Sequence, residues 1–273
     1  MFAWLKRIAD EWNDYPLDAG TWVAGRFRIV KRLGMGSYGL AYQAVDESTG
    51  TPCLLKHDRP SKRGLSKKLL KREGDWLDRL GHPCIPKKLA MFQSGRRCFL
   101  VTEFVEGMTA EQLVFEQGRT WTERDTLVVI KQLAVLARHI HERGVVHRDI
   151  RLPNVIFAGE DLHLIDFGLA CAIGESEPIT YGLSGIPEPR RADRTDTGCD
   201  FTDIGEFALY LLYAGYESAP GQEDLGWEEE LALHPHMRKL MRRLLEIDSP
   251  FPDAQALLDE LAFATRTLDT DSG

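Results

Sequence analysis

The stretch VVHRDIRLPNVIFAGEDLHLIDFG, residues 145–168, decides how the rest of the chain is interpreted. Two short apolar segments flank a turn at Ala158–Asp161, and they predict a pair of strands with polar residues at both ends. Asp149, Asn154 and Asp166 occupy these end positions. Catalytic side chains usually stand on loops held by rigid elements, so we expect these three residues to be functional.

The residue types at these positions suit phosphoryl transfer. A carboxylate such as Asp149 can accept the proton of a hydroxyl and orient the attacking oxygen. Asn154 and Asp166 supply hard oxygen ligands, which magnesium ions prefer. The ordered set of His147-Arg148-Asp149, Asn154 and Asp166-Phe167-Gly168 has the spacing of a phosphotransferase template and is too specific to arise by chance.

A glycine-rich segment, Gly34-Met35-Gly36-Ser37-Tyr38-Gly39, lies upstream between two strand-like stretches. Its glycines allow a hairpin backbone to approach phosphates closely. Taken alone, the segment is equally consistent with a plain glycine hairpin. A dinucleotide-binding loop would lead into a helix, whereas LAYQAV after Gly39 has the pattern of a strand, so that alternative is disfavoured.

Lys56 ends the apolar run CLLK, where a buried ammonium group requires anionic partners. The segment Ser66–Leu80 has apolar residues at helical spacing, and Glu73 lies within its apolar stripe. A Lys56–Glu73 pair that also meets phosphate groups would satisfy both charges, and it would form only when the helix is correctly placed. The competing interpretation is an exposed lysine with a purely structural ion pair.

The rest of the chain divides into a β-rich half and a helical half. From Phe27 to about Val101, apolar and β-branched stretches alternate with turn sequences, and only the helix around Glu73 interrupts them. Beyond Glu103 the periodicity becomes helical. The helices expected there span Glu123–Arg143, Thr202–Ala214, His236–Ile247 and Asp253–Thr267.

In this order and over residues 25–267, the motifs resemble those of a eukaryotic-like (Hanks-type) serine/threonine protein kinase of the bacterial type, in a compact form. The resemblance implies an α+β, bilobal fold. Its β-rich N-lobe, about residues 25–103, would hold one helix, called αC, and its C-lobe, about residues 106–267, would be mostly helical and shortened. The implied activity is transfer of the ATP γ-phosphate, with Mg²⁺ as cofactor, to serine or threonine of a protein, with autophosphorylation.

The resemblance also implies roles for individual residues. It assigns catalysis to Asp149, Arg151, Lys56 and Glu73, and the Mg²⁺ ligands to Asn154 and Asp166. The residues implied to bind the nucleotide are Gly34, Gly36, Gly39, Ala41, Leu54, Lys56, Thr102, Glu103, Val105 and Ile156. Thr102 falls at the family's gatekeeper position, and the backbones of Glu103 and Val105 would hydrogen-bond adenine.

Several positions depart from the family pattern. Ala41 replaces a valine and Leu54 an alanine, so one position loses the volume that the other gains, and we expect ATP still to bind. Arg151 replaces a lysine but keeps a cation for the γ-phosphate. Ile186, in the segment Gly185-Ile186-Pro187-Glu188, lacks a threonine hydroxyl, so the family's mode of substrate docking carries over least to this chain.

A buried ion pair of the family is missing on both sides. Asp193 stands where the glutamate of the A-P-E motif belongs, and Phe251 stands where its arginine partner is expected. The loss of both partners is tolerable, whereas the loss of one would leave the other as an unpaired buried charge. Asp203 resembles the family's helix-anchoring aspartate, and the short sequence that follows it predicts a trimmed helical insert.

Arg148 precedes Asp149, and in the family such an arginine pairs with a phosphorylated activation loop through charge-assisted hydrogen bonds. The candidate phosphorylation sites are Thr180, Tyr181 and Ser184. The alternative is that these are ordinary loop hydroxyls, because the loop is short.

Residues 1–24 are expected to form an extension before the domain, and residues 268–273 a flexible tail. Phe2, Leu5, Ile8 and Trp12 lie at helical spacing, so residues 1–12 could contact a membrane or a partner as an amphipathic helix. Docking on the chain's own domain is favoured, because short terminal helices usually bury their apolar stripe locally.

The charge of the chain is unevenly distributed. The net charge is -8, yet the segment Lys56–Arg72 holds eight basic residues and a single acidic one. Such a cluster could bind nucleic acid through its phosphates. A solvated helix face is favoured, because no aromatic residues are interleaved to stack on bases.

Composition and segment lengths exclude several other classes. No apolar run approaches the roughly 20 residues that span a bilayer, and the charged first segment argues against a signal peptide. The five cysteines form no C-x-x-C pair, which argues against a zinc site or a disulfide framework and fits a cytoplasmic location. Two alternatives stay open, namely a kinase of a sugar, lipid or antibiotic, and a non-catalytic pseudokinase scaffold.

Overall fold

The computed structural model describes residues 15–35, 39–59, 64–176, 194–217 and 225–271, with every side chain in these ranges except those of Met35 and residues 268–271. The chain forms two compact units. The first comprises the residues up to Glu106 together with Asp166–Leu169. The second comprises Gly107–Ile165 and the chain from Ala170 onward.

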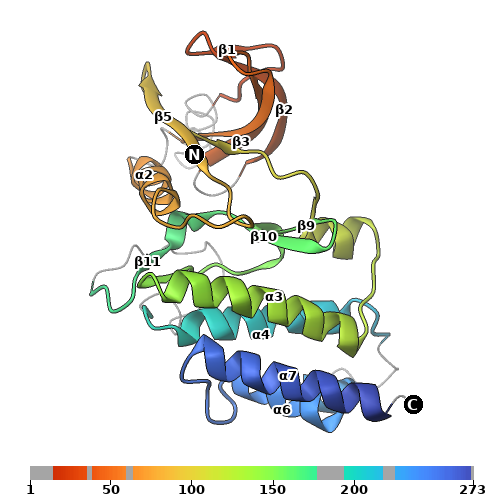
Figure 1. Cartoon of the computed structure of the whole chain (residues 1–273). Coiled ribbons are helices and arrows are strands. Elements are labelled where there is room, and N and C mark those ends of the chain that lie inside the picture. Colours follow the sequence, from red (N-terminus) through yellow and green to blue (C-terminus); the bar gives the residue numbers. More distant parts are fainter. Residues whose placement is uncertain (1–14, 36–38, 60–63, 177–193, 218–224, 272–273) are drawn as a thin grey trace, which may run out of the picture. The chain divides into compact units, whose positions relative to one another are not determined.

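The first unit is built on a six-stranded sheet in which all neighbouring strands are antiparallel. Its strands are β1 (Trp22–Val23), β2 (Phe27–Met35), β3 (Gly39–Asp46), β4 (Thr51–Asp58), β5 (Lys88–Ser94) and β6 (Arg97–Glu103), in the order β1-β2-β3-β4-β6-β5. Figure 1 shows this sheet as the red to yellow part of the ribbon. The β-rich first half that the sequence predicts is therefore confirmed.

Alternation along the strands decides which face of the sheet is buried. In β3, Leu40, Tyr42 and Ala44 are fully buried, whereas the residues between them are half-buried. Stacked aromatic rings extend the same core, with Phe92 lying 5.7 Å from Phe27 and 5.3 Å from Phe99 between ring centroids. One face of the sheet thus forms the core, and the other face carries the residues expected at the nucleotide site.

Helix α2 (Leu65–Leu77), in the first unit, packs against strands β4, β5 and β6. It begins after Gly64, whose φ of 84° lies in the left-handed region that favours glycine. The buried face of α2 includes Leu69, Leu70 and Leu77, and Glu73 is buried among them. The apolar stripe expected from the sequence is therefore present, and it carries the carboxylate inward.

Residues that the sequence assigns to an N-terminal extension take part in this unit. Strand β1 pairs Trp22 with Arg28 and Val23 with Phe27. The N–H of Leu17 donates to the hydroxyl of Tyr42 at 3.1 Å, and Val23 is part of the sheet core. Residues 1–14, with the predicted amphipathic helix, lie outside the described residues, as does the 60–63 portion of the basic run.

The second unit is mostly helical, as the sequence predicts. Its longer helices are α3 (Glu123–His141), α4 (Gly198–Tyr213), α6 (Pro235–Leu244) and α7 (Ala254–Asp271). Two shorter helices are η2 (Gln112–Glu116), before α3, and α5 (Trp227–Glu230), between α4 and α6. Helix α3 lies against α4 and α7, and α6 contacts the same two helices (Figure 1). Helix α7 continues to Asp271, so residues 268–271 belong to a helix and not to the terminal tail expected over 268–273.

Short strands and single helical turns carry the motif segment, residues 145–168. Strands β9 (Val155–Ala158) and β10 (Asp161–Leu164) form the predicted hairpin, and β7 (Met108–Thr109) adds a third strand beside β9. Strand β8 (Val145–Val146) pairs with β11 (Cys171–Ala172). The turns are η3 (Leu152–Asn154), in the second unit, and η4 (Phe167–Leu169), in the first. None of the helices seen in the described residues has both the length and the apolar character needed to cross a membrane.

Candidate active site

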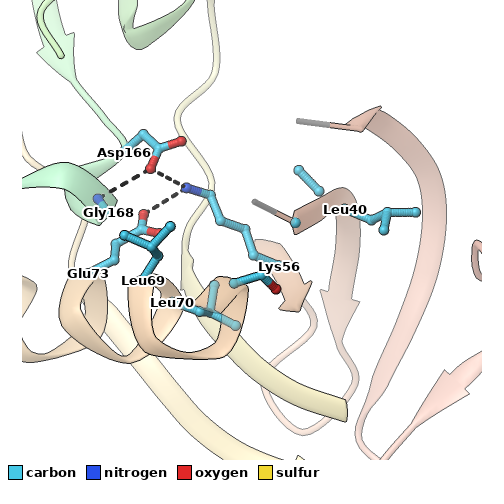
Figure 2. A pocket seen from close by; sticks show the side chains of 10 residues that line it. Leu40, Lys56, Leu69, Leu70, Glu73, Asp166 and Gly168 are labelled. Atoms are coloured by element: carbon cyan, nitrogen blue, oxygen red, sulfur yellow. Dashed lines mark hydrogen bonds and ion pairs between the residues drawn. The ribbon is translucent and has the colours of Figure 1, made fainter. Parts of the chain in front are cut away.

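The first unit holds a lysine between two carboxylates. The Nζ of Lys56, on β4, lies 2.7 Å from Oε1 of Glu73, on α2. It also lies 3.4 Å from Oδ1 of Asp166, the residue just before η4 (Figure 2). The structure thus contains the Lys56–Glu73 pair that the sequence predicts, and adds Asp166 to it.

Burial and the neighbouring charges have opposite effects on the pKa values of Lys56 and Glu73. The side chains of Lys56 and Glu73 are 13% and 6% exposed. Burial by itself would lower the pKa of Lys56, but the carboxylates of Asp166 and Glu73 outweigh it and raise that pKa. Burial raises the pKa of Glu73 to about 7, and the attraction of Lys56 offsets this only in part. The pair is therefore balanced between the cost of desolvation and the gain from attraction.

A cavity of about 100 Å³ opens beside the Lys56 ammonium (Figure 2). It is lined by Gly39, Leu40, Ala41, Lys56, Ser66, Leu69, Leu70, Glu73, Asp166 and Gly168. The cavity therefore brings together the end of the glycine-rich segment, the charged triplet and the apolar face of α2.

The strand register places most of the expected nucleotide-binding residues of this unit on one face of the sheet. Ala41 pairs with Lys56 across β3 and β4, and Leu54 pairs with Thr102 across β4 and β6. Directly paired residues project to the same face, and residues two apart on a strand do so as well. Ala41 and Leu54 are therefore diagonal neighbours on the face that carries Lys56, where a loss of volume at one can be met by a gain at the other.

Two glycines of the predicted phosphate-binding segment lie within the described residues. Gly34 pairs with Ala41, and a β-carbon there would meet no atom within 4 Å. A β-carbon at Gly39 would lie 2.8 Å from the carbonyl oxygen of His57, so only glycine fits without a shift of the backbone. Gly36 lies outside the described residues.

The expected adenine-binding residues differ in the backbone groups that they have available. The N–H of Glu103 donates to the carbonyl of Lys87 at 2.9 Å, so its own carbonyl is the group left for a ligand. That carbonyl also accepts the hydroxyl of the buried Thr102 at 3.3 Å. Among the residues that the structure describes, none hydrogen-bonds the backbone of Val105. Ile156 belongs to the second unit, where it pairs with Thr109 and His163.

The second unit fixes the carboxylate of Asp149 from two sides. The amide of Asn154 donates to Asp149 Oδ2 at 2.7 Å and to the Asp149 carbonyl at 2.9 Å. Nε of Arg151 lies 3.0 Å from Asp149 Oδ1, and the Arg151 side chain is half exposed. Asp149 and Asn154, expected from their spacing, and Arg151, implied by the resemblance, are therefore in contact.

Two buried aspartates of α4 hold the backbone around Asp149. Oδ1 of Asp200 accepts the N–H of Arg148 at 2.8 Å, and both its carboxylate oxygens accept the N–H of His147 at 3.0 and 3.1 Å. Asp203 accepts the N–H of Ile150 at 3.0 Å. The anchoring of His147 and Arg148 thus belongs to Asp200, which the sequence reasoning missed when it gave the anchoring role to Asp203.

The Asp200 carboxylate holds a strained part of the backbone in this loop. Arg148 has a φ of 66°, a conformation that non-glycine residues adopt only when their surroundings enforce it. Burial would raise the pKa of Asp200, but the hydrogen bond from His141 and the charges of His141 and His147 outweigh it and lower that pKa. An ionised carboxylate can accept all of these N–H groups at once.

The proposed metal ligands suit a magnesium ion. Both hydrogens of the Asn154 amide point to Asp149, and no described residue donates to Asn154 Oδ1, so that oxygen is available to a cation. The side chain of Asp166 is 37% exposed. The described residues hold no group of three or more His, Cys, Asp or Glu arranged for a metal. Magnesium sites in phosphotransferases use few protein oxygens, and phosphate and water oxygens complete the coordination of the ion.

Several predicted positions are not part of the described structure. The candidate phosphorylation sites Thr180, Tyr181 and Ser184 fall in residues 177–193, together with Ile186 and Asp193. Phe251 is buried, and the guanidinium of Arg243 lies 3.9 Å from the centre of its ring.

The first unit has an antiparallel sheet, a helix packed on it and a buried lysine–glutamate pair, and the second unit has the Asp149–Asn154 loop. Each of these is a feature of phosphate-transferring enzymes. Residues 27–185 match the protein kinase domain. The chain belongs to the protein kinase family, whose members use ATP, typically with Mg²⁺.

Three curated relatives show how far the likeness extends. The chain is 32% identical to the probable serine/threonine-protein kinase YbdM of Bacillus subtilis over 266 residues, which cover 97% of this chain and 99% of that protein. It is 30% identical to serine/threonine-protein kinase B of Synechocystis, over 88% of this chain and 47% of that protein. It is also 26% identical to a probable myosin light chain kinase of Dictyostelium discoideum, over 80% of this chain and 75% of that protein.

Proposed function

We propose that this protein kinase transfers the γ-phosphate of ATP to a serine or threonine hydroxyl of a protein substrate. The choice of serine or threonine is supported by the names of its relatives, two of them bacterial serine/threonine kinases. Phosphoryl transfer itself is supported by the charged residues Lys56, Glu73 and Asp149.

The observation that carries the proposal is the position of Lys56. Its ammonium is almost buried and lies within 3.4 Å of both Glu73 and Asp166. Because these carboxylates raise its pKa, Lys56 stays charged at neutral pH. We assign Lys56 to the ATP phosphates, with Glu73 as the residue that orients it.

Asp149 is the residue that receives the acceptor hydroxyl. Its two carboxylate oxygens are fixed by Asn154 and Arg151, so it can orient the hydroxyl and accept its proton as the oxygen attacks phosphorus. Nε of Arg151 lies 3.0 Å from Asp149 Oδ1 and its side chain is half exposed, so we assign its guanidinium to the negative charge of the transferred phosphoryl group.

Asn154 and Asp166 would hold Mg²⁺, which when bound neutralises phosphate charge. Both side chains offer oxygen donors, which magnesium prefers, whereas thiolate and imidazole donors suit transition metals.

The proposal is tested with the purified full chain, labelled ATP, Mg²⁺ and a generic basic protein as acceptor, followed by identification of the phosphorylated amino acids. We expect phosphoserine or phosphothreonine in the acceptor or in the chain itself, and none with Asp149→Ala. Parallel reactions with sugars, lipids and aminoglycosides address the small-molecule alternative. Label in a small molecule only, or equal incorporation by Asp149→Ala, would refute the proposal.

A further inference from the structure

A cluster of charged side chains lies at the start of helix α4, apart from the residues assigned to catalysis. Nη2 of Arg194 is 2.8 Å from Oε1 of Glu246, which follows helix α6. Nε and Nη2 of the same guanidinium are 3.1 and 2.7 Å from the carboxylate of Asp196. Asp196 in turn accepts the N–H of Gly198, the first residue of α4, at 2.9 Å. One arginine thus joins the start of α4 to the end of α6.

Gly198 provides the space that this cluster occupies. A β-carbon at position 198 would lie 2.4 Å from Arg194 Nη2, 2.7 Å from Asp196 Oδ1 and 3.2 Å from Glu246 Oε1. Its φ is not in the left-handed region, so the position requires glycine for its size and not for its conformation. Any side chain there would displace the guanidinium from its two carboxylates.

Glu246 occupies a backbone conformation that its side chain does not favour. Its φ is 58°, at the end of α6, where glycine or asparagine is the usual residue. A glutamate at such a position is a local strain that its surroundings must compensate. The contact of its carboxylate with Arg194 supplies that compensation, and it gives a reason for glutamate at this position.

The helix that this cluster fixes is the one that holds the proposed catalytic loop. Asp200 lies in the first turn of α4 and accepts the N–H groups of His147 and Arg148. Asp203 lies in the next turn and accepts the N–H of Ile150. A displacement of the start of α4 would therefore be transmitted directly to the backbone on both sides of Asp149.

We infer that Arg194 is a positioning residue for phosphoryl transfer, acting through its ion pairs with Glu246 and Asp196 to hold α4 and thereby the loop of Asp149. The inference rests on the proposed function, although the restraint of the loop can be measured without any activity. The Arg194 and Glu246 side chains are 28% and 35% exposed, so water screens the pair. Its loss should therefore lower kcat by up to about fivefold and not abolish transfer.

The chain offers a matched control for this cluster. Arg242, on α6, also pairs with two carboxylates, those of Glu228 and Asp248, at 2.7 and 2.8 Å. Its side chain is 31% exposed, close to that of Arg194. Neither Glu228 nor Asp248 belongs to α4, so Arg242→Ala removes a similar ion pair without disturbing the start of that helix.

The test compares Arg194→Ala, Glu246→Gly, Gly198→Ala and Arg242→Ala by two measurements. The first is hydrogen exchange of the His147, Arg148 and Ile150 amides, and the second is kcat with KM for ATP. We expect faster exchange and lower kcat in the first three variants, with KM for ATP unchanged because the Lys56 group is untouched. Glu246→Gly should also keep or raise the melting temperature, since glycine relieves the strain at a positive φ.

Exchange in Arg194→Ala no faster than in Arg242→Ala would overturn the inference, as would faster exchange with unchanged kcat. If the wild-type chain phosphorylates no protein, the proposed function fails, whereas the exchange rates still decide whether Arg194 restrains the loop.

Discussion

The ammonium of Lys56 and the carboxylate of Glu73 lie 2.7 Å apart and are both nearly buried, so one ion pair joins strand β4 to helix α2. A buried charge that loses its partner is costly, and α2 cannot move away from β4 without that cost. The placement of α2 is thereby coupled to the phosphate-binding role proposed for Lys56. Asp166, 3.4 Å from the same ammonium, adds η4 to this coupling.

Replacing Lys56 by methionine removes the ammonium and keeps a side chain of similar length. We expect kcat/KM for phosphate transfer to fall by at least about 100-fold, because a fixed charge directed at the phosphates is lost. Initial rates with labelled ATP measure the effect. Lys67→Met is the control, since Lys67 is exposed on α2 and, among the described residues, hydrogen-bonds only Gln93. Equal losses in the two variants would exclude a specific role for Lys56.

The raised pKa of Glu73 predicts a pH dependence of stability in the free protein. The pKa of Glu73 is about 7 in the folded chain, against an ordinary value of 4.5. Between these values the folded state holds a proton that the unfolded state has released, so the free energy of unfolding falls as pH rises, by at most about 1.4 kcal/mol per unit. Urea unfolding at pH 5, 6 and 7 measures this slope.

Glu73→Gln is the control for that slope, because a glutamine side chain does not titrate. The free energy of unfolding of the wild type, relative to that of Glu73→Gln, should therefore decrease from pH 5 to pH 7. A constant difference over this range would show that Glu73 keeps an ordinary pKa.

Gly39 and Gly34 provide a paired test of the glycine-rich segment. Alanine at position 39 would place a β-carbon 2.8 Å from the His57 carbonyl, whereas alanine at position 34 would meet nothing within 4 Å. We expect Gly39→Ala to lower the free energy of unfolding by about 2 kcal/mol, as overpacking does, and Gly34→Ala to change it little. Similar values for the two variants, from urea unfolding, would contradict the close approach of β3 and β4.

Asp200→Asn removes the charge that accepts the N–H groups of His147 and Arg148. Because the group is fully buried, we expect a loss of about 2 kcal/mol in stability, with a lower kcat. Asp253→Asn is the matched control, since Asp253 accepts one backbone N–H, that of Ala256, at an exposed helix start. A smaller loss for Asp200→Asn than for Asp253→Asn would argue against the anchoring role.

The local part of this site was predictable from the sequence because it depends on short-range pattern. Spacing alone places Glu73 in the apolar stripe of a helix, and turn chemistry at Ala158–Asp161 predicts the β9–β10 hairpin. Asp149 and Asn154 are close in sequence, and the contact between them follows from a tight loop. These features require only the backbone periodicities of helix and strand.

The long-range part was not predictable in the same way. Asp200 and Asp203 are three residues apart on α4, so they share a helix face, and spacing cannot say which one reaches His147. The pairing of Arg194 with Glu246 joins segments far apart in sequence. Only the packing of α4 and α6 brings such residues together.

The most direct test of the central claim, that Asp149 serves phosphate transfer from ATP to a protein hydroxyl, is the rate of transfer by Asp149→Asn measured beside its affinity for Mg-ATP. Asparagine keeps an oxygen that can accept the Asn154 amide but cannot take a proton. We predict a transfer rate lower by about 10²- to 10⁴-fold with nearly unchanged ATP affinity. A wild-type transfer rate in Asp149→Asn would contradict the claim.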